Sequence, residues 1–327
     1  MTHQRSLRHI ARTIGLVAAM AAAPMGAQAQ DYPSQDIRFI CGFPAGSGAD
    51  VLVRYFGEKV RQIANRTIIV ENKVGAAGNI AAVYTARSKP DGHTVYVHAA
   101  SAIAANMHLF KAPPIDAGKD LQIVAGINKQ PFMMMVPAAS PYQTLAELTE
   151  AMKQKGAKAS YAQSNTSGKV MGELYKRATG IQAVEVPYRT ANDSLNDFAS
   201  GTIDYGTMDP VFALSQAREG RLRMLAVSTS HRMQAVPDLP TMAEAGVPGV
   251  ELLTWFAVMV PSATPRPIVD KLNKWFNEVL ATDETRKFLS SFGGDPFITT
   301  PDEGQALFRQ GIKDWEGHVK AAKIEPQ

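Results

Sequence analysis

Residues 37–48 read IRFICGFPAGSG, and this stretch decides the fold class of the 327-residue chain. The apolar run 37–41 predicts a buried strand, and the glycines and proline after it predict a tight loop. Beyond the loop, apolar residues recur at the three- and four-residue spacing of an amphipathic helix: Leu52, Phe56, Val60 and Ile63. Strand, loop and helix together form the repeating unit of α/β proteins.

The same alternation continues along the chain. Further short apolar runs predict strands at 67–70, 94–97, 121–124, 132–136, 159–162, 183–186, 203–208 and 222–227. Two helix starts have the spacing of capping boxes, Thr144 with Glu147 and Thr300 with Glu303. Alternating strands and helices predict mainly parallel sheets with helices on both faces. Because there are too many strands for one compact sheet, we expect two separate runs of βα units.

The loops between strands and helices are rich in small and hydroxyl residues: Gly46, Ser47, Gly48, Ala76, Ala77, Gly78, Thr166, Ser167 and Gly168. In a parallel sheet such loops gather at the carboxyl edge of the strands, where ligands bind. Helices that begin there direct free backbone N–H groups into the crevice, which suits a carboxylate. The alternative is that these residues only form turns and caps. Asp50 would repel an anion, so it fits better as a cap of its own loop or helix.

Composition excludes several classes of protein. With 45% hydrophobic and 20% charged residues, the chain is neither disordered nor fibrous. The formal net charge is +4, and three of the basic residues, Arg5, Arg8 and Arg12, lie in the first dozen positions. The remainder is close to neutral, so nothing indicates nucleic-acid binding. Cys41 is the single cysteine, and its apolar neighbours predict a small buried side chain rather than a reactive thiol.

The N-terminus has the three regions of a secretory signal peptide. Basic residues precede the apolar run 14–23, and Pro24 and the small-residue motif 27–29 follow it. The run is too short to span a bilayer, and the alternative is a buried N-terminal helix. We expect cleavage after Ala29 and a protein that acts outside the cytoplasm.

Enzyme motifs are incomplete in this sequence. The stretch 46–48 lacks the first glycine of a nucleophile elbow, and Val51 replaces the third glycine of a dinucleotide fingerprint. The stretch 167–169 resembles only the end of a P-loop, and no two histidines have metal-ligand spacing. We therefore predict no catalytic residue, cofactor or metal. A secreted hydrolase with Ser47 or Ser167 as nucleophile is the alternative, although no base partner is recognisable.

Several motifs follow one another over the whole mature chain. They are Asp31-Tyr32-Pro33, Phe43-Pro44-Ala45-Gly46 with Asp50, Val70-Glu71-Asn72, Gly75-Ala76-Ala77-Gly78-Asn79-Ile80, Lys89-Pro90-Asp91-Gly92, Val186-Pro187-Tyr188, Pro237-Asp238-Leu239-Pro240-Thr241 and Ala243-Glu244-Ala245-Gly246. In this order they resemble the Bug proteins, the periplasmic solute-binding receptors of tripartite tricarboxylate transporters. The resemblance implies an α/β fold of the type II periplasmic binding protein class. Two lobes would be joined by two crossing strands, with the ligand cleft between them.

The resemblance also implies domain boundaries and a ligand site without catalysis. After the signal peptide at 1–29, lobe 1 is expected at 30–128 plus 254–327 and lobe 2 at 129–253. The predicted ligand-binding residues are Phe43, Ala45, Gly46, Ser47, Gly48, Asp50, Ser101, Ser164, Asn165, Thr166, Ser167, Gly168, Tyr188, Arg189, Thr190 and Asp209. The family usually has glycine where this chain has Ser47 and Thr190, so the pocket shape is expected to differ. Arg189 would either pair with a second carboxylate or remain a solvated charge at the rim.

The function implied by the resemblance is that of a periplasmic receptor. It would capture a small carboxylate, either an aliphatic di- or tricarboxylate or an aromatic carboxylate, and deliver it to the membrane components of a tripartite transporter. We expect a monomer with no nucleic-acid partner.

Overall fold

The computed structural model describes residues 32–233 and 236–326. The fold lies within residues 35–327. The predicted signal peptide, residues 1–29, lies outside the described residues.

Lobe 1 is the part of the fold built around a six-stranded sheet of order β11-β4-β10-β3-β1-β2. Its strands are β1 (Ile37–Cys41), β2 (Ile68–Asn72), β3 (Thr94–Ala99), β4 (Leu121–Gln130), β10 (Thr254–Pro261) and β11 (Asp295–Pro296). Its helices are α2 (Gly48–Ala64), η1 (Ala76–Gly78), α3 (Asn79–Ala86), α4 (Ala100–Leu109), α5 (Ala117–Asp120), α10 (Arg266–Leu280), α11 (Asp283–Ser291) and α12 (Pro301–Ala321).

Lobe 2 is built around a five-stranded sheet of order β7-β6-β8-β5-β9. Its strands are β5 (Met133–Pro137), β6 (Ser160–Gln163), β7 (Val184–Pro187), β8 (Tyr205–Met208) and β9 (Leu222–Val227). Its helices are α6 (Leu145–Lys155), η2 (Gly156–Lys158), α7 (Thr166–Thr179), η3 (Ala191–Ser194), α8 (Leu195–Ala199) and α9 (Pro210–Arg218). The prediction of two α/β sheets is confirmed.

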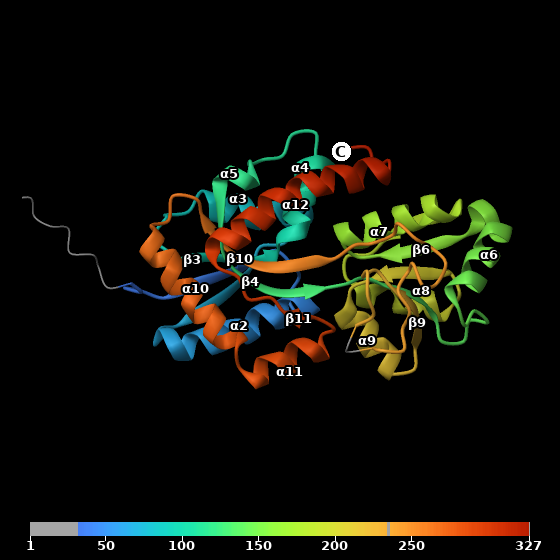
Figure 1. Cartoon of the computed structure of the whole chain (residues 1–327), viewed down its shortest axis with the longest axis horizontal. Helices are drawn as coiled ribbons and strands as arrows, with labels where there is room; N and C mark the ends of the chain where they lie inside the picture. The colour runs from blue at the N-terminus through green and yellow to red at the C-terminus, as the bar shows by residue number, and fades with distance from the viewer. Residues whose placement is uncertain (1–31, 234–235, 327) are drawn as a thin grey trace, which may run out of the picture. The chain divides into compact units, whose positions relative to one another are not determined.

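Two long antiparallel strands connect the two sheets. Strand β4 leads out of lobe 1 and β10 leads back into it, and they pair from Leu121↔Pro261 to Gln130↔Thr254 (Figure 1). The expectation of mainly parallel sheets is therefore wrong, because a chain that leaves a lobe and returns beside itself must run in opposite directions. In lobe 2, β5 likewise pairs antiparallel with β8 and β9. The lobe boundaries at 128/129 and 253/254 fall near the ends of these strands and stay predictions.

Local rules explain most of the helix ends. Both predicted capping boxes are present, because Thr144 and Thr300 each accept a hydrogen bond from the backbone of the glutamate three residues on. Helix α4 was not predicted. Residues 100–106 of α4 are all buried, so the segment lacks the alternation of polar and apolar residues that marks a surface helix.

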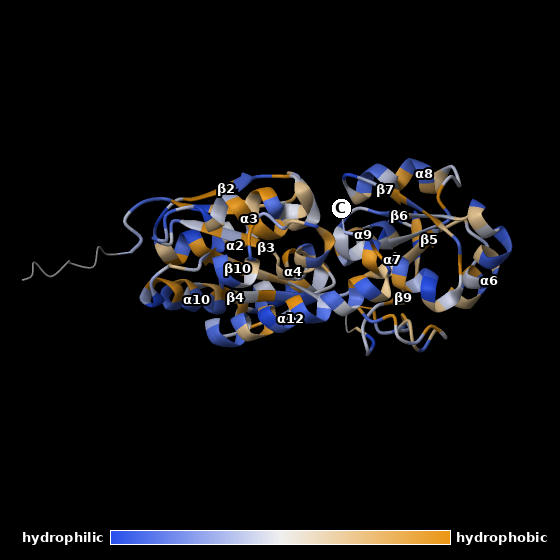
Figure 2. Cartoon of the chain, turned by 90° about the horizontal axis from the view of Figure 1, so that it is seen from above, coloured by the Kyte–Doolittle hydropathy of each residue, from blue (hydrophilic) through white to orange (hydrophobic). Residues whose placement is uncertain are grey.

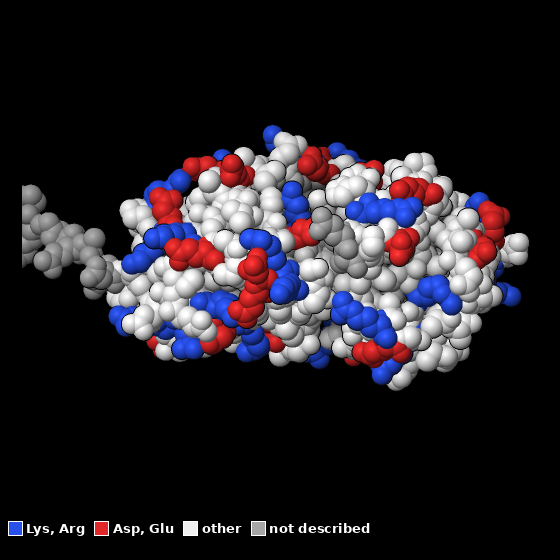
Figure 3. Space-filling model, turned by 60° about the horizontal axis from the view of Figure 1, so that its bottom comes forward, with Lys and Arg blue, Asp and Glu red and all other residues white. Residues whose placement is uncertain are grey.

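Apolar packing ties the helices to the sheets. In lobe 1 the rings of Phe39 in β1 and Phe56 in α2 both pack against Phe276 in α10, with centroids 5.7 and 6.0 Å away. Helices such as α10 and α12 carry hydrophilic and hydrophobic residues together, as expected of helices with one buried face (Figure 2). The face of the molecule in Figure 3 intersperses basic and acidic side chains, without a continuous surface of one sign. Among the described residues, no helix combines the length and apolar character needed to cross a bilayer.

Candidate functional site

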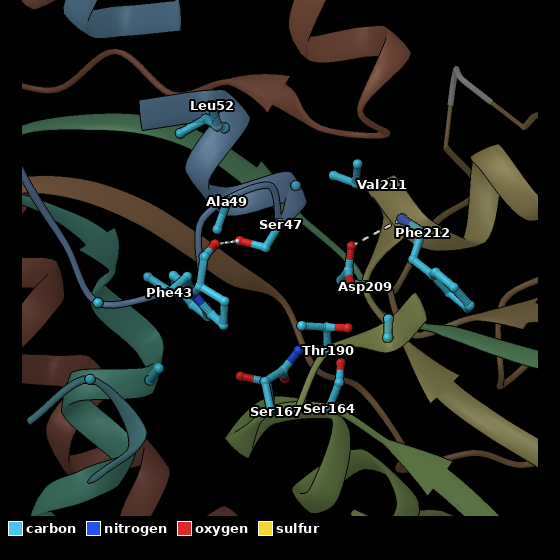
Figure 4. Close-up of a pocket in the computed structure, with 18 of the residues that line it drawn as sticks. Phe43, Ser47, Ala49, Leu52, Ser164, Ser167, Thr190, Asp209, Val211 and Phe212 are labelled. Carbon is cyan, nitrogen blue, oxygen red and sulfur yellow. Dashed lines mark hydrogen bonds between the residues drawn. The ribbon is translucent and has the colours of Figure 1, made fainter. Parts of the chain in front are cut away.

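A pocket of about 420 Å³ is lined by residues of both lobes. Lobe 1 contributes the loop before α2, the loop before α3 and the end of β3, while lobe 2 contributes the starts of α7, η3 and α9. Figure 4 shows Phe43 and Ser47 on one side of this space and Ser164, Ser167 and Thr190 on the other. The volume is in the range of small-molecule binding sites.

The structure brings most of the predicted ligand-binding residues to this pocket. Those that line it are Phe43, Gly46, Ser47, Gly48, Ser164, Asn165, Thr166, Ser167, Arg189, Thr190 and Asp209. The predicted residues outside the lining are Ala45, Asp50, Ser101, Gly168 and Tyr188. Whether the residues of the first group contact a ligand stays a prediction.

The loop before α2 presents backbone N–H groups to the pocket. Ser47 is the N-cap of α2: its Oγ accepts from Asp50 N at 3.3 Å and donates to Pro44 O at 2.7 Å. The amides of Gly48 and Ala49 make no hydrogen bond within the described residues, as expected for the first turn of a helix. Two free donors and the positive end of the helix dipole therefore lie at this wall.

Asp50 does not line the pocket, and its side chain instead stabilises the loop before α2. Its buried carboxylate accepts hydrogen bonds from Gly46 N and Arg54 Nε, both at 2.9 Å, and from Asn72 Nδ2 at 2.8 Å. Burial alone would raise the pKa of Asp50, but these hydrogen bonds together hold it below its ordinary value. The carboxylate therefore stays ionised, and its hydrogen-bonding partners offset its negative charge. The repulsion expected between Asp50 and an anionic ligand is reduced.

The wall before α3 has an unusual backbone. Gly75, Ala76, Ala77 and Gly78 all have positive φ, at 138°, 46°, 53° and 90°. The two alanines are in a region that costs a non-glycine residue roughly 1–3 kcal/mol. Asn106 Nδ2 donates to Ala77 O at 2.9 Å, and Tyr96 OH donates to Gly78 O at 3.1 Å. Buried side chains thus hold this strained segment against the pocket.

In lobe 2, the start of α7 presents free backbone N–H groups to the pocket, as the start of α2 does in lobe 1. Asn165 is the N-cap of α7 and accepts from Gly168 N at 3.0 Å, while the amides of Thr166 and Ser167 make no hydrogen bond within the described part of the chain. Gly168 is buried, and a Cβ there would lie 2.7 Å from Thr207 O, so its glycine serves packing. Arg189 is exposed at the rim and has no ion pair among the described residues.

Two further predicted residues outside the lining have structural partners. Tyr188 OH donates to Asp197, and Ser101 Oγ is buried and accepts from Trp255 N at 3.1 Å. Asp209 does line the pocket and is the N-cap of α9, accepting from Phe212 N at 3.1 Å (Figure 4). Burial raises the pKa of Asp209, against the lowering effect of backbone hydrogen bonds.

Sequence reasoning missed the apolar part of the site. Phe132, Phe212, Phe256 and Phe292 line the pocket from β4–β5, α9, β10 and the end of α11. His98 also lines it, and its ring is stacked on Phe43 at 4.3 Å and on Tyr96 at 4.9 Å. Burial lowers the pKa of His98 to about 3, so the imidazole is neutral. No local pattern marks these residues, because they come from four distant segments.

The described residues of the site show neither a serine paired with an imidazole nor a metal-binding cluster. Ser47 Oγ is engaged with Pro44 O and Asp50 N, and no imidazole lies within hydrogen-bond distance of Ser47 or Ser167 in the residues described. No group of three or more His, Cys, Asp or Glu residues within 32–233 and 236–326 could hold a metal ion. What the pocket does offer is two helix starts, one from each lobe, with free N–H donors.

Comparison with known proteins decides the family. The model of the tripartite tricarboxylate transporter family receptor matches residues 52–323. The chain belongs to this family. The family is one of solute-binding receptors, and the resemblance to the Bug proteins is confirmed.

Three solved receptors are similar to the chain over nearly their whole length. The R. palustris protein Rpa4515 with adipate is 29% identical, with a TM-score of 0.86 over 91% of this chain and 100% of that one. The periplasmic binding protein BugD is 27% identical, with a TM-score of 0.84 over 90% and 100%. MatC from Rhodopseudomonas palustris, with bound malate, is 26% identical, with a TM-score of 0.80 over 88% and 100%. The expected periplasmic-binding-protein fold is thereby confirmed.

Proposed function

We propose that the chain is a periplasmic receptor that captures a small carboxylate between its two lobes and delivers it to a tripartite tricarboxylate transporter. The observation that carries this proposal is the pair of helix starts facing one pocket. Gly48 and Ala49 at α2, and Thr166 and Ser167 at α7, present backbone N–H groups without acceptors. An anion supplies acceptors for such groups and is stabilised by the helix dipoles.

The ligand is expected to carry a carboxylate at each end. One carboxylate would bind at the α2 start in lobe 1, and the other at the α7 start in lobe 2, beside the hydroxyls of Ser164 and Thr166. Two of the similar receptors are described with adipate and with malate, both of which are dicarboxylates. This similarity supports the same class of ligand for this chain.

Export, delivery and oligomeric state complete the proposal. We propose cleavage after Ala29. Mass spectrometry of protein released by osmotic shock tests this proposal, because the mass of the mature protein fixes its N-terminus.

Deletion of the gene should abolish uptake of the bound carboxylate by intact cells. We also propose that the receptor works as a monomer, which light scattering with and without ligand tests.

Isothermal titration calorimetry of the mature protein over mono-, di- and tricarboxylates tests the proposed ligand class. Thr166→Pro removes one of the free N–H groups at the start of α7, where proline is sterically tolerated. We expect it to weaken binding while the melting temperature of the free protein changes little. Thr300 is followed by Pro301 at the equivalent position of α12, so the chain already contains such a start. If no carboxylate in the panel binds, or if an ester panel is turned over in a Ser47-dependent way, the receptor proposal is wrong and the hydrolase alternative gains support.

A further inference from the structure

Few side chains with formal charge line the pocket. Arg189 and Asp209 are the side chains with formal charge among the described residues that line it, and their charges are opposite. His98 is enclosed and neutral. Much of the positive potential therefore comes from the starts of α2 and α7, which provide one anion-binding end in each lobe.

An apolar belt lies between the two ends. We define it as Phe43, Phe132 and Phe256. The Phe43 and Phe256 rings lie 6.0 Å apart, and both residues line the pocket. Phe132 reaches the opposite end, because its Cε1 lies 3.5 Å from the Cβ position of Gly168 at the α7 start. At the mouth, Val51 and Val74 remain 41% and 39% exposed while lining the pocket, which adds an apolar rim.

Acceptors for a hydroxyl proton are scarce along this belt. Ser47 Oγ already accepts from Asp50 N, and Gln130 Oε1 already accepts from Asn128 Nδ2 at 3.2 Å. His98 lines the pocket, but its Nδ1 is buried, and its ring is stacked on Phe43 and Tyr96. A hydroxyl in the middle of a ligand would lose its hydrogen bonds to water and gain few in return.

Among the described lining residues, side-chain hydroxyls and amides concentrate in lobe 2, where Thr190, Asn192, Ser215 and Gln216 also line the pocket. Ser164, Thr166 and Ser167 line the pocket at the start of α7, where the second carboxylate is expected. These three hydroxyls lie where they can donate hydrogen bonds to the second carboxylate rather than to a hydroxyl in the middle of the ligand. The pocket thus has polar ends and an apolar middle.

We propose that this receptor selects dicarboxylates whose two carboxylates are joined by an aromatic ring or an unsubstituted chain, and rejects hydroxylated di- and tricarboxylates. The inference rests on the proposed function and narrows its ligand class. Planar rings gain additional contact from the belt, because aromatic side chains stack favourably on one another. The selectivity would differ from that of MatC, which is described with malate.

Calorimetric titration with four probes tests the proposal: benzene-1,4-dicarboxylate, adipate, malate and citrate. We expect the first two to bind at least ten-fold more tightly than the last two. Malate or citrate binding as tightly as adipate would overturn the proposed selectivity while leaving the receptor function intact. Failure of all four to bind, with binding of no other carboxylate, would overturn the receptor function itself.

Two variants distinguish the contribution of the belt to ligand affinity from general effects on folding. Phe43→Leu removes one ring of the belt, and we expect it to weaken the binding of benzene-1,4-dicarboxylate several-fold more than that of adipate. Phe276→Leu is the matched control, because Phe276 packs against Phe39 and Phe56, and none of the three lines the pocket. It should leave the ratio of the two affinities unchanged. An equal loss for both ligands in Phe43→Leu contradicts a role for the ring.

Val74→Thr adds a hydroxyl to the pocket rim with almost no change in shape. Because Val74 is partly exposed, the variant is expected to fold normally. We expect the ratio of adipate to malate affinity to fall by about two- to five-fold, since the new hydroxyl offers malate a partner. Selection by the apolar middle of the pocket would be ruled out by two results together. The ratio of adipate to malate affinity would be unchanged in Val74→Thr, and the ratio of benzene-1,4-dicarboxylate to adipate affinity would be unchanged in Phe43→Leu.

Discussion

Gly48 in lobe 1 leaves just enough room for Val211 in lobe 2. A Cβ atom on Gly48 would lie 2.8 Å from Val211 Cγ1 and 2.9 Å from Val211 Cβ. Both residues line the pocket, one at the start of α2 and the other in the first turn of α9. A methyl group at position 48 therefore forces the two lobes apart or displaces the valine.

Replacing Gly48 by alanine should weaken ligand binding without unfolding the protein. We expect a loss of about 1–3 kcal/mol in binding free energy, the usual range for overpacking, measured by calorimetry. The double variant Gly48→Ala/Val211→Ala should recover most of this loss, because it removes the atoms that clash. As a control, Gly311→Ala lies in α12 with nothing within 4 Å of its Cβ, and it should leave affinity unchanged. A double variant as weak as Gly48→Ala would show that the contact does not limit binding.

Replacing Asp50 by asparagine should destabilise the protein and loosen the loop that presents Gly48. The three hydrogen bonds to its buried carboxylate predict a loss of about 1–3 kcal/mol in the free energy of unfolding. Because the pKa of Asp50 is lower in the folded than in the unfolded protein, its contribution is present above the unfolded value and is lost as pH falls through the folded value. Chemical denaturation from pH 7 to pH 3 should therefore show a smaller pH dependence in Asp50→Asn than in the parent. Asp36→Asn, an exposed residue outside this loop, should cause no measurable change.

Arg189→Ala tests whether the rim cation recognises a second carboxylate. If it does, dicarboxylate binding should weaken by about 1–2 kcal/mol, as for a hydrogen bond to a charged group, while monocarboxylate binding should hardly change. Lys169→Ala is the matched control, since Lys169 is paired with Glu185 at 3.3 Å and does not line the pocket. Unchanged affinity for both mono- and dicarboxylates would leave Arg189 a solvated rim charge.

Asp209→Asn should tighten carboxylate binding at neutral pH. Asparagine can still cap α9, because it retains the oxygen that accepts from Phe212 N, but it no longer repels an anion. Burial raises the pKa of Asp209, so the folded protein favours the protonated carboxyl. As pH rises above the pKa of Asp209 in the unfolded protein, ionising the buried carboxyl lowers the free energy of unfolding. In the parent, affinity should therefore increase as pH falls through the raised pKa, whereas Asp209→Asn should lack this increase. Titrations of both proteins over a series of falling pH values check the difference, and Asp116→Asn, outside the pocket, serves as the control.

The sequence alone determined the βα units and the local ends of the helices. Apolar runs and helical periodicity depend on neighbours a few residues apart, so β1, α2 and the capping boxes at Thr144 and Thr300 could be predicted without a structure. For the same reason, the loops at Gly46–Gly48 and Thr166–Ser167 could be recognised as helix starts with free N–H groups.

Only the tertiary structure decided which of these residues share a pocket and what fills the space between them. The belt of Phe43, Phe132 and Phe256 joins segments that lie 89 and 124 residues apart along the chain, and no local pattern connects them. Burial separated Asp50 from the lining, because whether a carboxylate faces a ligand or its own loop depends on partners such as Asn72, contributed by another strand. The contact of Gly48 with Val211 likewise exists only because β4 and β10 bring the two lobes together, which is a property of the assembled chain.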